Sequence, residues 1–384
     1  MNVLHILHSV SNMDRAGVET MLMNYYRHMD RDRIQFDFLM NRTKPGDYDG
    51  EIRALGGRIF ISPGLSPAKY PAYMAFMARL LGEHPEIRAL HAHNEGMAFY
   101  ALRGAQRAGL PVRIAHAHNT RFLPDYKWPL KMACKALLPL AATELCACGT
   151  DSGVFFFGKR LWRERGRLIP NAIDVQRFRY QEALRAQVRR AYGLGDAPVI
   201  GHVGRMSPQK NHKRLLRIFA ACLARVPQAW LVLIGVGELE AELRALARRL
   251  NIAERTLFLG LREDTHAWYQ AMDVLLMPSL FEGLPVVGVE AQAAGLPCVF
   301  SDAVTPEALL LAQSCRLPLS APDSVWVDRI VRLCRSPLRR EEGAVRVAEA
   351  GYDIVREARR LQAWYLALTG EERAGGACAF VRPD

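Results

Sequence analysis

The sequence contains few cysteines and no hydrophobic run long enough to cross a membrane. Eight cysteines are spread over 384 residues, none in a Cys-x-x-Cys pair, and only Cys146 and Cys148 lie close together. Neither a disulfide framework nor a zinc site is indicated, and we expect reduced cysteines in the core. The most apolar stretch, residues 136–157, is interrupted by Glu144 and Asp151 and does not provide the roughly 18 apolar residues of a spanning helix.

The first ten residues, MNVLHILHSV, lack the cationic segment and the small-residue cleavage site of a secretory signal peptide. They have the pattern of a first β-strand, and we therefore expect a cytoplasmic protein. Hydrophobic residues make up 50% of the chain and charged residues 23%, which is typical of a globular protein rather than a disordered or fibrous one. The length predicts two domains of roughly 150 to 200 residues.

Positive charge is in excess and is unevenly distributed. The formal net charge is +12, and residues 1–170 hold 23 Lys and Arg against 15 Asp and Glu, whereas the remainder holds 28 against 24. An excess of positive charge gives information about binding partners rather than about the fold. Anionic lipid, nucleic acid and a phosphorylated substrate are the candidates.

Short apolar runs alternate with longer amphipathic segments, and this rhythm occurs twice. Strand–helix–strand repetition predicts right-handed crossovers and a parallel sheet covered on both faces. The expected strands are residues 2–8, 34–40, 58–61, 87–92, 112–117 and 143–148, and then 198–203, 229–234, 256–259, 274–277 and 297–301. The expected helices include residues 18–29, 70–83, 97–108, 212–225, 239–250 and 286–294. We predict an α/β fold of two Rossmann-like parallel-sheet domains.

The domain boundary should fall between residues 169 and 196, where two turn-rich clusters flank a charged helix. The predicted domains are residues 1–170 and residues 171–351. Residues 371–384, rich in glycine, are expected to form a frayed tail.

Ligands of parallel sheets bind beyond the carboxyl ends of the strands. Strand 198–203 is followed by Arg205 and Lys210, five residues apart and just before a helix. Two such cations suit a diphosphate, because a guanidinium bridges two oxygens and the helix N-terminus adds its dipole. A solvated basic loop fits the spacing equally well. The glycines of Gly235-Val236-Gly237 would let a ligand approach the backbone, although this pattern is common in turns.

Two carboxylates follow strand 274–277. Glu282 precedes an expected helix, and Glu290 lies eight residues on, about two turns away and on roughly the same face. A carboxylate suits the paired hydroxyls of a ribose or sugar, and the amides of Gly283 and Leu284 suit phosphate oxygens. Glu282 is equally explained as a partner of the helix dipole, whereas Glu290 stands among apolar residues and needs a partner.

Together the Arg205–Lys210 loop, the Glu282 and Glu290 pair and Ile169-Pro170-Asn171-Ala172-Ile173-Asp174 resemble the retaining glycosyltransferases of family 4, which have the GT-B fold. Gly17-Val18-Glu19 and His116-Ala117-His118-Asn119 are similar to the subgroup that builds capsular and extracellular polysaccharides. The resemblance covers nearly the whole chain. It implies two Rossmann-like domains facing a central cleft, with a final helix, residues 352–370, packing back on the first domain.

The resemblance also implies roles for individual residues. Glu290 would hold the ribose of a nucleotide sugar, Glu282 the donor sugar, and Arg205 and Lys210 the leaving diphosphate, which favours the transition state as charge develops. The other donor contacts it implies are Gly17, Gly235, Leu261, Arg262, Gly283 and Leu284. At Gly17 the usual Gly-Gly is Ala16-Gly17 here. The anomeric configuration would be retained because the acceptor attacks from the same face that the phosphate leaves, and the leaving phosphate would take the acceptor proton.

Histidines are concentrated in the first domain, with His91 and His93 at one strand end and His116 and His118 at another. We expect one imidazole of each pair to face each side of the sheet. No cysteine or acidic ligand accompanies them, so a metal is not indicated. The resemblance places His118 against the donor sugar and phosphate, with His93 and Asn119 as further cleft residues and His116 as a structural one.

Two Asp-x-Asp sequences, Asp30-Arg31-Asp32 and Asp47-Tyr48-Asp49, match the spacing used by metal-dependent transferases of another fold. The first ends a helix and the second lies in a loop, so we expect both to be solvated surface. No metal and no cofactor is expected.

A basic segment, residues 121–140, spaces Lys127, Lys131 and Lys135 four residues apart beside Trp128 and several leucines. Such a helix suits an anionic lipid surface, and a domain helix with a solvated lysine edge explains it equally. Nucleic acid is less favoured because no recognised motif accompanies the charge. A polyprenyl-diphosphate-linked acceptor would account for the basicity.

These observations predict a retaining glycosyltransferase of the hexosyl or N-acetylhexosaminyl type. It would move a sugar from a nucleotide sugar, foremost a UDP-sugar, to a growing lipid-linked glycan in exopolysaccharide or capsule biosynthesis, at the inner face of the plasma membrane. A GT-B nucleotide-sugar epimerase and a non-catalytic nucleotide-sugar sensor are the alternatives.

Overall fold

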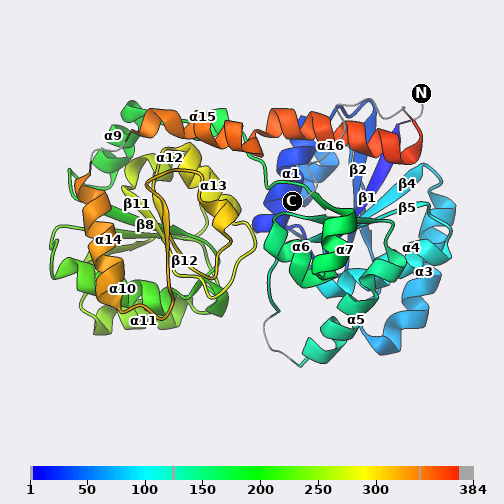
Figure 1. Cartoon of the computed structure of the whole chain (residues 1–384), viewed down its shortest axis with the longest axis horizontal. Coiled ribbons are helices and arrows are strands. Elements are labelled where there is room, and N and C mark those ends of the chain that lie inside the picture. The colour runs from blue at the N-terminus through cyan, green and yellow to red at the C-terminus, as the bar shows by residue number, and fades with distance from the viewer. Residues whose placement is uncertain (1–2, 123–125, 337–338, 372–384) are drawn as a thin grey trace. The chain divides into compact units, whose positions relative to one another are not determined.

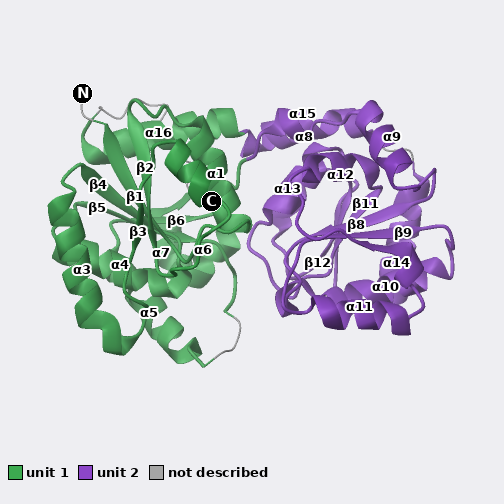
Figure 2. Ribbon diagram, turned by 180° about the vertical axis from the view of Figure 1, so that it is seen from behind, with its two compact units in different colours: residues 1–172, 354–384 green, residues 173–353 purple. Residues whose placement is uncertain are grey.

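The computed structural model describes residues 3–122, 126–336 and 339–371 of the chain. It contains two compact units: Met1–Ala172 with Ile354–Asp384, called unit 1, and Ile173–Asp353, called unit 2 (Figure 2). The boundaries expected from the sequence, after residues 170 and 351, lie two residues before those of the structure. All but the first residue of the expected tail, 371–384, lies outside the described residues.

Unit 1 is built on a parallel sheet with the strand order β3-β2-β1-β4-β5-β6-β7. The strands are β1 (Leu4–Val10), β2 (Ile34–Met40), β3 (Ile59–Ile61), β4 (Ile87–Ala92), β5 (Val112–Ala117), β6 (Glu144–Ala147) and β7 (Gly166–Leu168). The helices are α1 (Gly17–His28), α2 (Asp49–Ala54), α3 (Tyr70–Glu83), α4 (Ala98–Arg107), α5 (Trp128–Ala141), α6 (Thr150–Phe157), α7 (Lys159–Arg165) and α16 (Ile354–Thr369). Because every described strand pair is parallel, the loops that leave the carboxyl ends lie along one edge of the sheet.

Alternate strand residues of unit 1 enter two separate cores. Ile6 of β1 packs in a cluster with α1, α2 and α16, and its neighbour Leu7 packs in a second cluster with α3, α4 and α5. The sheet is therefore covered on both faces, as the strand–helix–strand repetition predicted.

Helix α16 returns from the end of unit 2 to lie along α1 (Figure 1). Its residues Leu361, Trp364 and Tyr365 are buried in the cluster that α1 shares with β1 and β2. Gln362 adds a polar link, because its side-chain oxygen accepts a hydrogen bond of 2.9 Å from the backbone N–H of Asp30. The last helix is thus part of the core of unit 1.

Unit 2 repeats the architecture with the strand order β10-β9-β8-β11-β12-β13, again parallel. The strands are β8 (Val199–Val203), β9 (Trp230–Ile234), β10 (Thr256–Phe258), β11 (Val274–Met277), β12 (Cys298–Ser301) and β13 (Cys315–Leu317). The helices are α8 (Val175–Phe178), α9 (Glu182–Ala191), α10 (His212–Leu223), α11 (Glu240–Arg249), α12 (Thr265–Ala271), α13 (Val286–Ala293), α14 (Asp323–Arg335) and α15 (Gly343–Val347). The predicted fold of two Rossmann-like α/β domains is confirmed.

None of the seven described cysteines takes part in a disulfide, and five of them are buried. None of the helices in the described ranges combines the length and apolarity that crossing a bilayer requires.

Candidate active site

The loops that follow β8 and β9 are bonded to each other along the carboxyl edge of the unit 2 sheet. The N–H of Gly204 donates to Ile234 (2.9 Å) and the N–H of Met206 donates to Val236 (3.0 Å). Arg205, between these two contacts, is exposed, and its guanidinium has no hydrogen-bond or ion-pair partner among the described residues. The loop backbone is held in place while the cation at its tip faces solvent.

The glycines of the second loop are explained by this contact. A Cβ on Gly235, whose φ is +131°, would overlap the carbonyl oxygen of Gly204, and a Cβ on Gly237 would overlap that of Met206. Both glycines are therefore required for loop-to-loop packing. From the sequence, Gly235 was explained by the close approach of a ligand to the backbone. The contact with the Gly204 carbonyl explains this glycine by packing within the protein instead.

Lys210 and Glu282 form an ion pair that joins the loops after β8 and β11. The ammonium Nζ lies 2.6 Å from Oε1 of Glu282, and the side chains are 16% and 8% exposed. An ammonium has three N–H donors, so the contact with Glu282 leaves Lys210 able to bind an anion as well. This burial shows that Lys210 itself is not a solvated side chain, as one of the two interpretations had it.

Two residues that the sequence analysis missed hold this pair together. Gln209 accepts from the N–H of Leu280 (2.8 Å) through its backbone and donates from Nε2 to the carbonyl of Phe281 (3.1 Å). Asn211 donates from Nδ2 to the carbonyl of Pro278 (3.0 Å) and has a left-handed backbone, with φ of 55°. Asparagine tolerates this conformation better than most residues, and its position directly before a helix was the available signal.

Glu282 and Glu290 do not lie on one helical face, as the spacing had predicted. Helix α13 begins at Val286, so Glu282 belongs to the preceding loop and only Glu290 is helical. Glu282 turns to Lys210, whereas Oε2 of Glu290 accepts a 2.8 Å hydrogen bond from the hydroxyl of Tyr269. Gly283 and Leu284 are buried between Glu282 and α13.

Glu290 is buried, and its surroundings change its acidity. Burial raises the pKa of its carboxyl to about 7, although the hydrogen bond from Tyr269 and the charge of Arg177 oppose the change. A carboxyl with such a pKa can both donate and accept hydrogen bonds near neutral pH. That property suits the hydroxyls of a ribose.

The loop after β10 joins the same edge. The N–H of Gly235 donates to the carbonyl of Gly260 (2.8 Å), and the adjoining Leu261 is 55% exposed. Arg262 is held by Asp264 through two hydrogen bonds of 2.8 and 2.6 Å. Four loops of unit 2 thus bring Arg205, Gly235 and the 260–262 segment to one edge, together with the Lys210–Glu282 pair.

In unit 1, histidines of three neighbouring strands form one buried cluster. His91 and His93 lie ring to ring, with centroids 4.3 Å apart, as do His116 and His118 at 4.1 Å. The prediction that each pair would divide between the two faces was wrong, because positions i and i+2 of a strand share a face. His8 of β1 joins the same group, 5.3 Å from His93.

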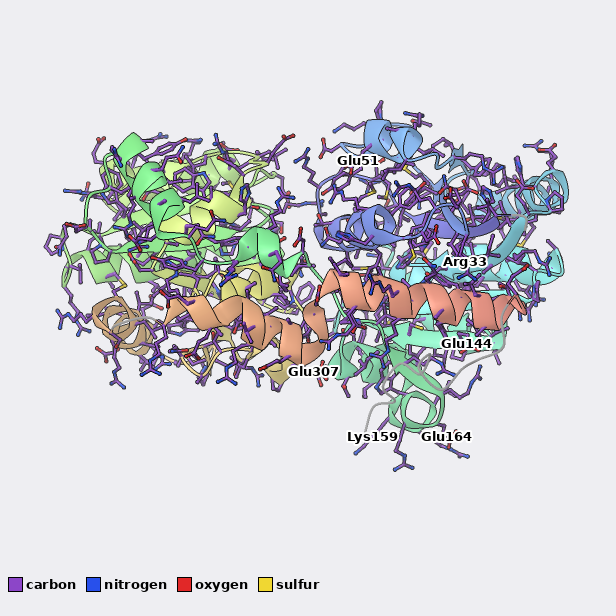
Figure 3. All side chains as sticks on the ribbon, turned by 90° about the horizontal axis from the view of Figure 1, so that it is seen from above. Arg33, Glu51, Glu144, Lys159, Glu164 and Glu307 are labelled. Carbon is purple, nitrogen blue, oxygen red and sulfur yellow. The ribbon has the colours of Figure 1, made fainter. Side chains whose placement is uncertain are left out.

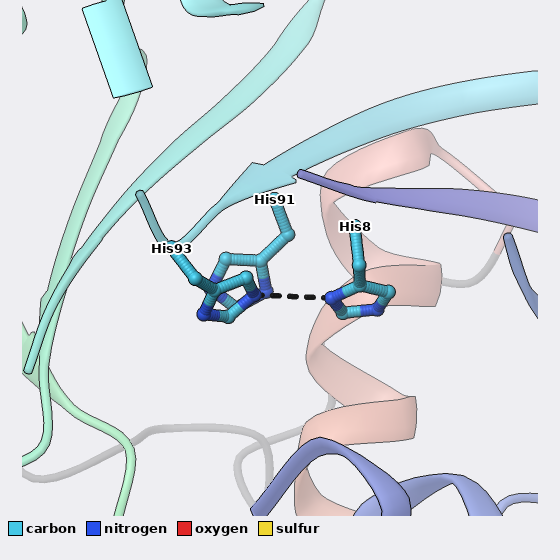
Figure 4. A group of neighbouring side chains, drawn as sticks. All are labelled: His8, His91 and His93. Carbon is cyan, nitrogen blue, oxygen red and sulfur yellow. Dashed lines mark hydrogen bonds between the residues drawn. The ribbon is translucent and has the colours of Figure 1, made fainter. Parts of the chain in front are cut away.

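Direct hydrogen bonds connect these imidazoles. His93 bonds through Nδ1 to Nε2 of His118 (2.9 Å) and through Nε2 to Nδ1 of His8 (3.1 Å), the contact drawn in Figure 4. His91 bonds to Nδ1 of His116 (3.1 Å) and to the hydroxyl of Tyr365 (2.6 Å). Both His93 and His118 of the predicted cleft residues therefore belong to a single network.

The remaining predicted positions of unit 1 differ in character. Gly17 is exposed at the start of α1, and a Cβ there would meet no atom within 4 Å, so packing does not require a glycine. Asn119 donates a hydrogen bond to Oε1 of Glu95. The expectation of solvated Asp-x-Asp pairs holds for residues 30–32 but is wrong for Asp49, which is buried in the first turn of α2.

Helix α5 presents an apolar rather than a cationic outer face. Lys127 and Lys131 are half-buried, and the ammonium of Lys135 lies 4.3 Å from the ring centre of Phe155. Leu140 is 72% exposed, and Trp128 and Leu137 are also exposed. The lysines therefore do not form the solvated edge that one reading of the sequence expected.

Comparison with known proteins identifies both halves of the chain. A family model described as glycosyltransferase family 4 matches residues 15–177, and one described as glycosyl transferases group 1 matches residues 197–335. EpsF of Bacillus subtilis (strain 168), whose name assigns it as a glycosyltransferase, is 40% identical over 355 residues, or 91% of this chain and 92% of its own.

Two further relatives have more specific names. The GDP-mannose-dependent alpha-(1-6)-phosphatidylinositol monomannoside mannosyltransferase of Mycolicibacterium smegmatis is 31% identical, covering 74% of this chain and 76% of its own. The UDP-Gal:alpha-D-GlcNAc-diphosphoundecaprenol alpha-1,3-galactosyltransferase of Escherichia coli is 29% identical, covering 75% and 76%.

Among solved structures, Anabaena Alr3699/HepE in complex with UDP is similar in fold, with a TM-score of 0.75 at 19% identity, covering 94% of this chain and 98% of that one. This similarity confirms the predicted GT-B class. With both halves matched by models of the same kind of enzyme and a relative at 40% identity over nine-tenths of the chain, the protein belongs to the family 4 glycosyltransferases.

Proposed function

We propose that the protein transfers a hexosyl or N-acetylhexosaminyl group, with retention, from a nucleotide sugar to a lipid-linked glycan in exopolysaccharide or capsule biosynthesis. A UDP-sugar is the donor we favour. The observation that carries the proposal is the Lys210–Glu282 ion pair at the sheet edge that also presents the exposed Arg205. Two cations on loops whose backbones are held by hydrogen bonds are suited to a diphosphate, and a buried carboxylate beside Lys210 is suited to sugar hydroxyls.

The donor contacts divide among the loops of unit 2. Arg205 and Lys210 bind the diphosphate, Glu282 the sugar, and Glu290 the ribose hydroxyls. Gly235, Leu261 and Arg262, with Gly283 and Leu284, form the rest of the donor surface. In unit 1 we assign Gly17 to the diphosphate or the acceptor, and His118, with His93 and Asn119 nearby, to the donor sugar.

The chemistry we propose is a same-face substitution. The bond between the anomeric carbon and the phosphate oxygen breaks, the acceptor hydroxyl oxygen bonds to that carbon on the same face, and its proton passes to the leaving phosphate. Negative charge builds on the diphosphate as the bond breaks, so Arg205 and Lys210 bind the transition state more tightly than the ground state. We propose that this step requires neither a metal nor a cofactor.

The names of two relatives support the finer parts of the proposal in different ways. One acts on a diphosphoundecaprenol-linked sugar with UDP-Gal and the other on a phosphatidylinositol mannoside with GDP-mannose. Both names specify a lipid-linked acceptor, whereas the bases differ. We favour uridine, and guanine is the competing base that the experiment must test.

A lipid-linked acceptor requires the protein to work at a membrane surface, and we propose that α5 makes this contact. Ala133, Leu137 and Leu140 are exposed and spaced four and three residues apart, which gives one apolar stripe along the helix. Exposed cations lie on α7 of the same unit, where Lys159 extends outward together with Glu164 (Figure 3). An apolar stripe and positive charge in one unit suit the inner, anionic face of the plasma membrane.

The donor assignment is tested with a thermal-shift panel of UDP, GDP and their sugars, followed by transfer assays with the best ligand. We expect UDP to raise the unfolding temperature of the wild type and Lys210→Met to abolish the shift. Lys213→Met is the matched control, because Lys213 forms a comparable pair with Glu242 (2.7 Å) only three residues away. Equal responses of the two variants would refute the diphosphate assignment.

Incubation with the donor alone separates the alternatives. A nucleotide-sugar epimerase converts its donor without an acceptor, and a sensor binds UDP without turnover. Transfer that requires an acceptor, is lost in Glu282→Ala and persists in the presence of a chelator is the result that our proposal predicts. Wild-type activity of Glu282→Ala with every donor would contradict it.

A further inference from the structure

The histidine cluster of unit 1 contains more imidazole nitrogens than its internal hydrogen bonds use. His8, His91, His93, His116 and His118 are all buried, between 0% and 7% exposed. Two triples within the cluster, His8–His91–His93 and His93–His116–His118, have ligand nitrogens that all lie within 4.8 Å of one another. Each neutral imidazole has one N–H donor and one lone pair. Each ring nitrogen can therefore be assigned a hydrogen-bond partner or shown to have none.

Two imidazole nitrogens of the cluster, Nε2 of His8 and Nε2 of His116, are buried without a hydrogen-bond partner among the described residues. Nδ1 of His8 is bonded to His93, and Nδ1 of His116 is bonded to His91. An unpaired buried nitrogen costs free energy unless something binds it. Nearby, Nδ1 of His93 and Nε2 of His118 face each other at 2.9 Å.

The imidazoles are held in the form that binds metals. Burial lowers the pKa of His118 to about 3, and it lowers the pKa of His93 and His116 well below the usual value, with neighbouring imidazoles adding to the effect. Their lone pairs are therefore not taken by protons near neutral pH.

We propose that His93, His116 and His118 form a binding site for a divalent transition metal of the zinc and cobalt class. The ligand atoms would be Nδ1 of His93, Nε2 of His116 and Nε2 of His118. Zinc–nitrogen bonds of about 2.0–2.1 Å set ligand nitrogens roughly 3.4 Å apart in a tetrahedron, so the 2.9 Å contact must open slightly and the third nitrogen approach. Three imidazoles leave the fourth position of a tetrahedral ion open.

The rest of the cluster then orients these ligands. Nε2–H of His93 donates to His8, the contact drawn in Figure 4, and Nδ1–H of His116 donates to His91, which in turn bonds to Tyr365. Hydrogen bonds of this kind fix the tautomer of a metal-binding histidine and raise its basicity. In this arrangement the ion binds the unpartnered Nε2 of His116 and takes the place of the hydrogen bond between His93 and His118, while the bonds of His93 to His8 and of His116 to His91 are kept.

The second triple, His8–His91–His93, is less suitable. His91 and His93 each have both nitrogens hydrogen-bonded, but not to each other. An ion held by this triple would replace one bond of His91 and one bond of His93, whereas an ion at the first triple replaces only the bond between His93 and His118. The distinction between the two triples makes the assignment testable with single substitutions.

The experiment uses the full chain without a histidine tag, treated with a chelator and then titrated with Co²⁺ while its visible ligand-field spectrum is recorded. We expect about one ion per chain and the strong bands of a four-coordinate site, displaced by Zn²⁺. His116→Gln should lose these bands. His8→Gln should keep them with affinity reduced by about 10- to 100-fold, and His28→Gln, on α1 of the same unit, should match the wild type.

Circular dichroism of each variant establishes that it is folded. No Co²⁺ spectrum in the wild type would overturn the proposal without recourse to any variant. Bands retained in His116→Gln but lost in His8→Gln would overturn the assignment in favour of the other triple. The proposal does not depend on the donor site in unit 2, because binding is read without turnover. The donor-sugar roles that we propose for His93 and His118, and transfer in the presence of a chelator, belong to the metal-free protein.

Discussion

Replacing Glu290 by Gln should make the stability of unit 2 less sensitive to pH. The carboxyl of Glu290 is buried and hydrogen-bonded to Tyr269 (2.8 Å), and burial raises its pKa to about 7 from the ordinary 4.5. A raised pKa means that the unfolded chain loses this proton first. The contribution of Glu290 to stability is therefore complete below about pH 4.5 and is lost as the pH rises through about 7.

The magnitude follows from the two pKa values. A difference of one in pKa corresponds to about 1.4 kcal/mol, so the rise from 4.5 to about 7 costs the folded unit about 3.5 kcal/mol well above pH 7. Between about pH 5 and about pH 8.5, wild type should lose about 2.5 kcal/mol that Glu290→Gln does not lose, or roughly 70-fold in an opening equilibrium.

Hydrogen-exchange mass spectrometry of α13 peptides measures that opening in unit 2 alone, after correction for intrinsic exchange rates. The glutamine also changes the hydrogen bond to Tyr269, but this effect is constant with pH and cancels in the comparison. Glu254→Gln, the loss of an exposed carboxylate in the same unit, is the control. If the opening of α13 depends on pH equally in wild type and Glu290→Gln, the carboxyl of Glu290 is not the group that makes unit 2 less stable as the pH rises.

Three other predictions concern single sites. Gly17→Ala should leave the free energy of unfolding unchanged or raise it by up to about 1 kcal/mol, but it should reduce turnover at least tenfold. Gly82→Ala, where an added Cβ also meets no neighbour, should retain activity in the same assay. Gly235→Ala should lower unfolding stability by roughly 1–3 kcal/mol, measured by denaturant titration, because of its left-handed φ and the contact with the neighbouring loop. Leu140→Glu should reduce cosedimentation with anionic vesicles severalfold relative to Val355→Glu, an exposed apolar residue on α16; equal binding would exclude α5 as the contact.

The fold could be predicted closely because the strand signals are local. The runs at Ile34–Met40 and Val112–Ala117 are mainly apolar, and their strands match the expected residues. The short edge strands β7 (Gly166–Leu168) and β13 (Cys315–Leu317) were missed. Each is three residues long and contains a central arginine, and each pairs on one side only, so no hydrophobic run marks it.

The candidate site could be predicted as a set of residues but not as a set of contacts. The residue types at Arg205, Lys210, Glu282 and Glu290 pointed to a diphosphate and to hydroxyls. The pairing of Lys210 with Glu282 spans 72 residues of sequence and depends on how two loops leave adjacent strands. The expected helix, residues 286–294, does begin at Val286, but Glu282 lies in the loop before it. Helical spacing counted across that loop therefore gave the wrong relation between the two carboxylates.

The histidine cluster shows a different limit. That His91 and His93 share a face follows from strand geometry and was available from the sequence. That His8, from another strand, joins them depends on the register of β1 against β4, in which His8 stands opposite His91. Such a register is set by the packing of the whole sheet.

Calorimetric titration of UDP and of uridine into wild type and Arg205→Met tests the central claim most directly. If unit 2 binds the diphosphate through Arg205, the substitution should weaken UDP binding by at least tenfold and leave uridine binding unchanged, since uridine has no phosphate. Arg249→Met, which removes an exposed arginine from the same unit, should change neither. Equal UDP affinity in wild type and Arg205→Met, or equal losses for UDP and uridine, would contradict the account.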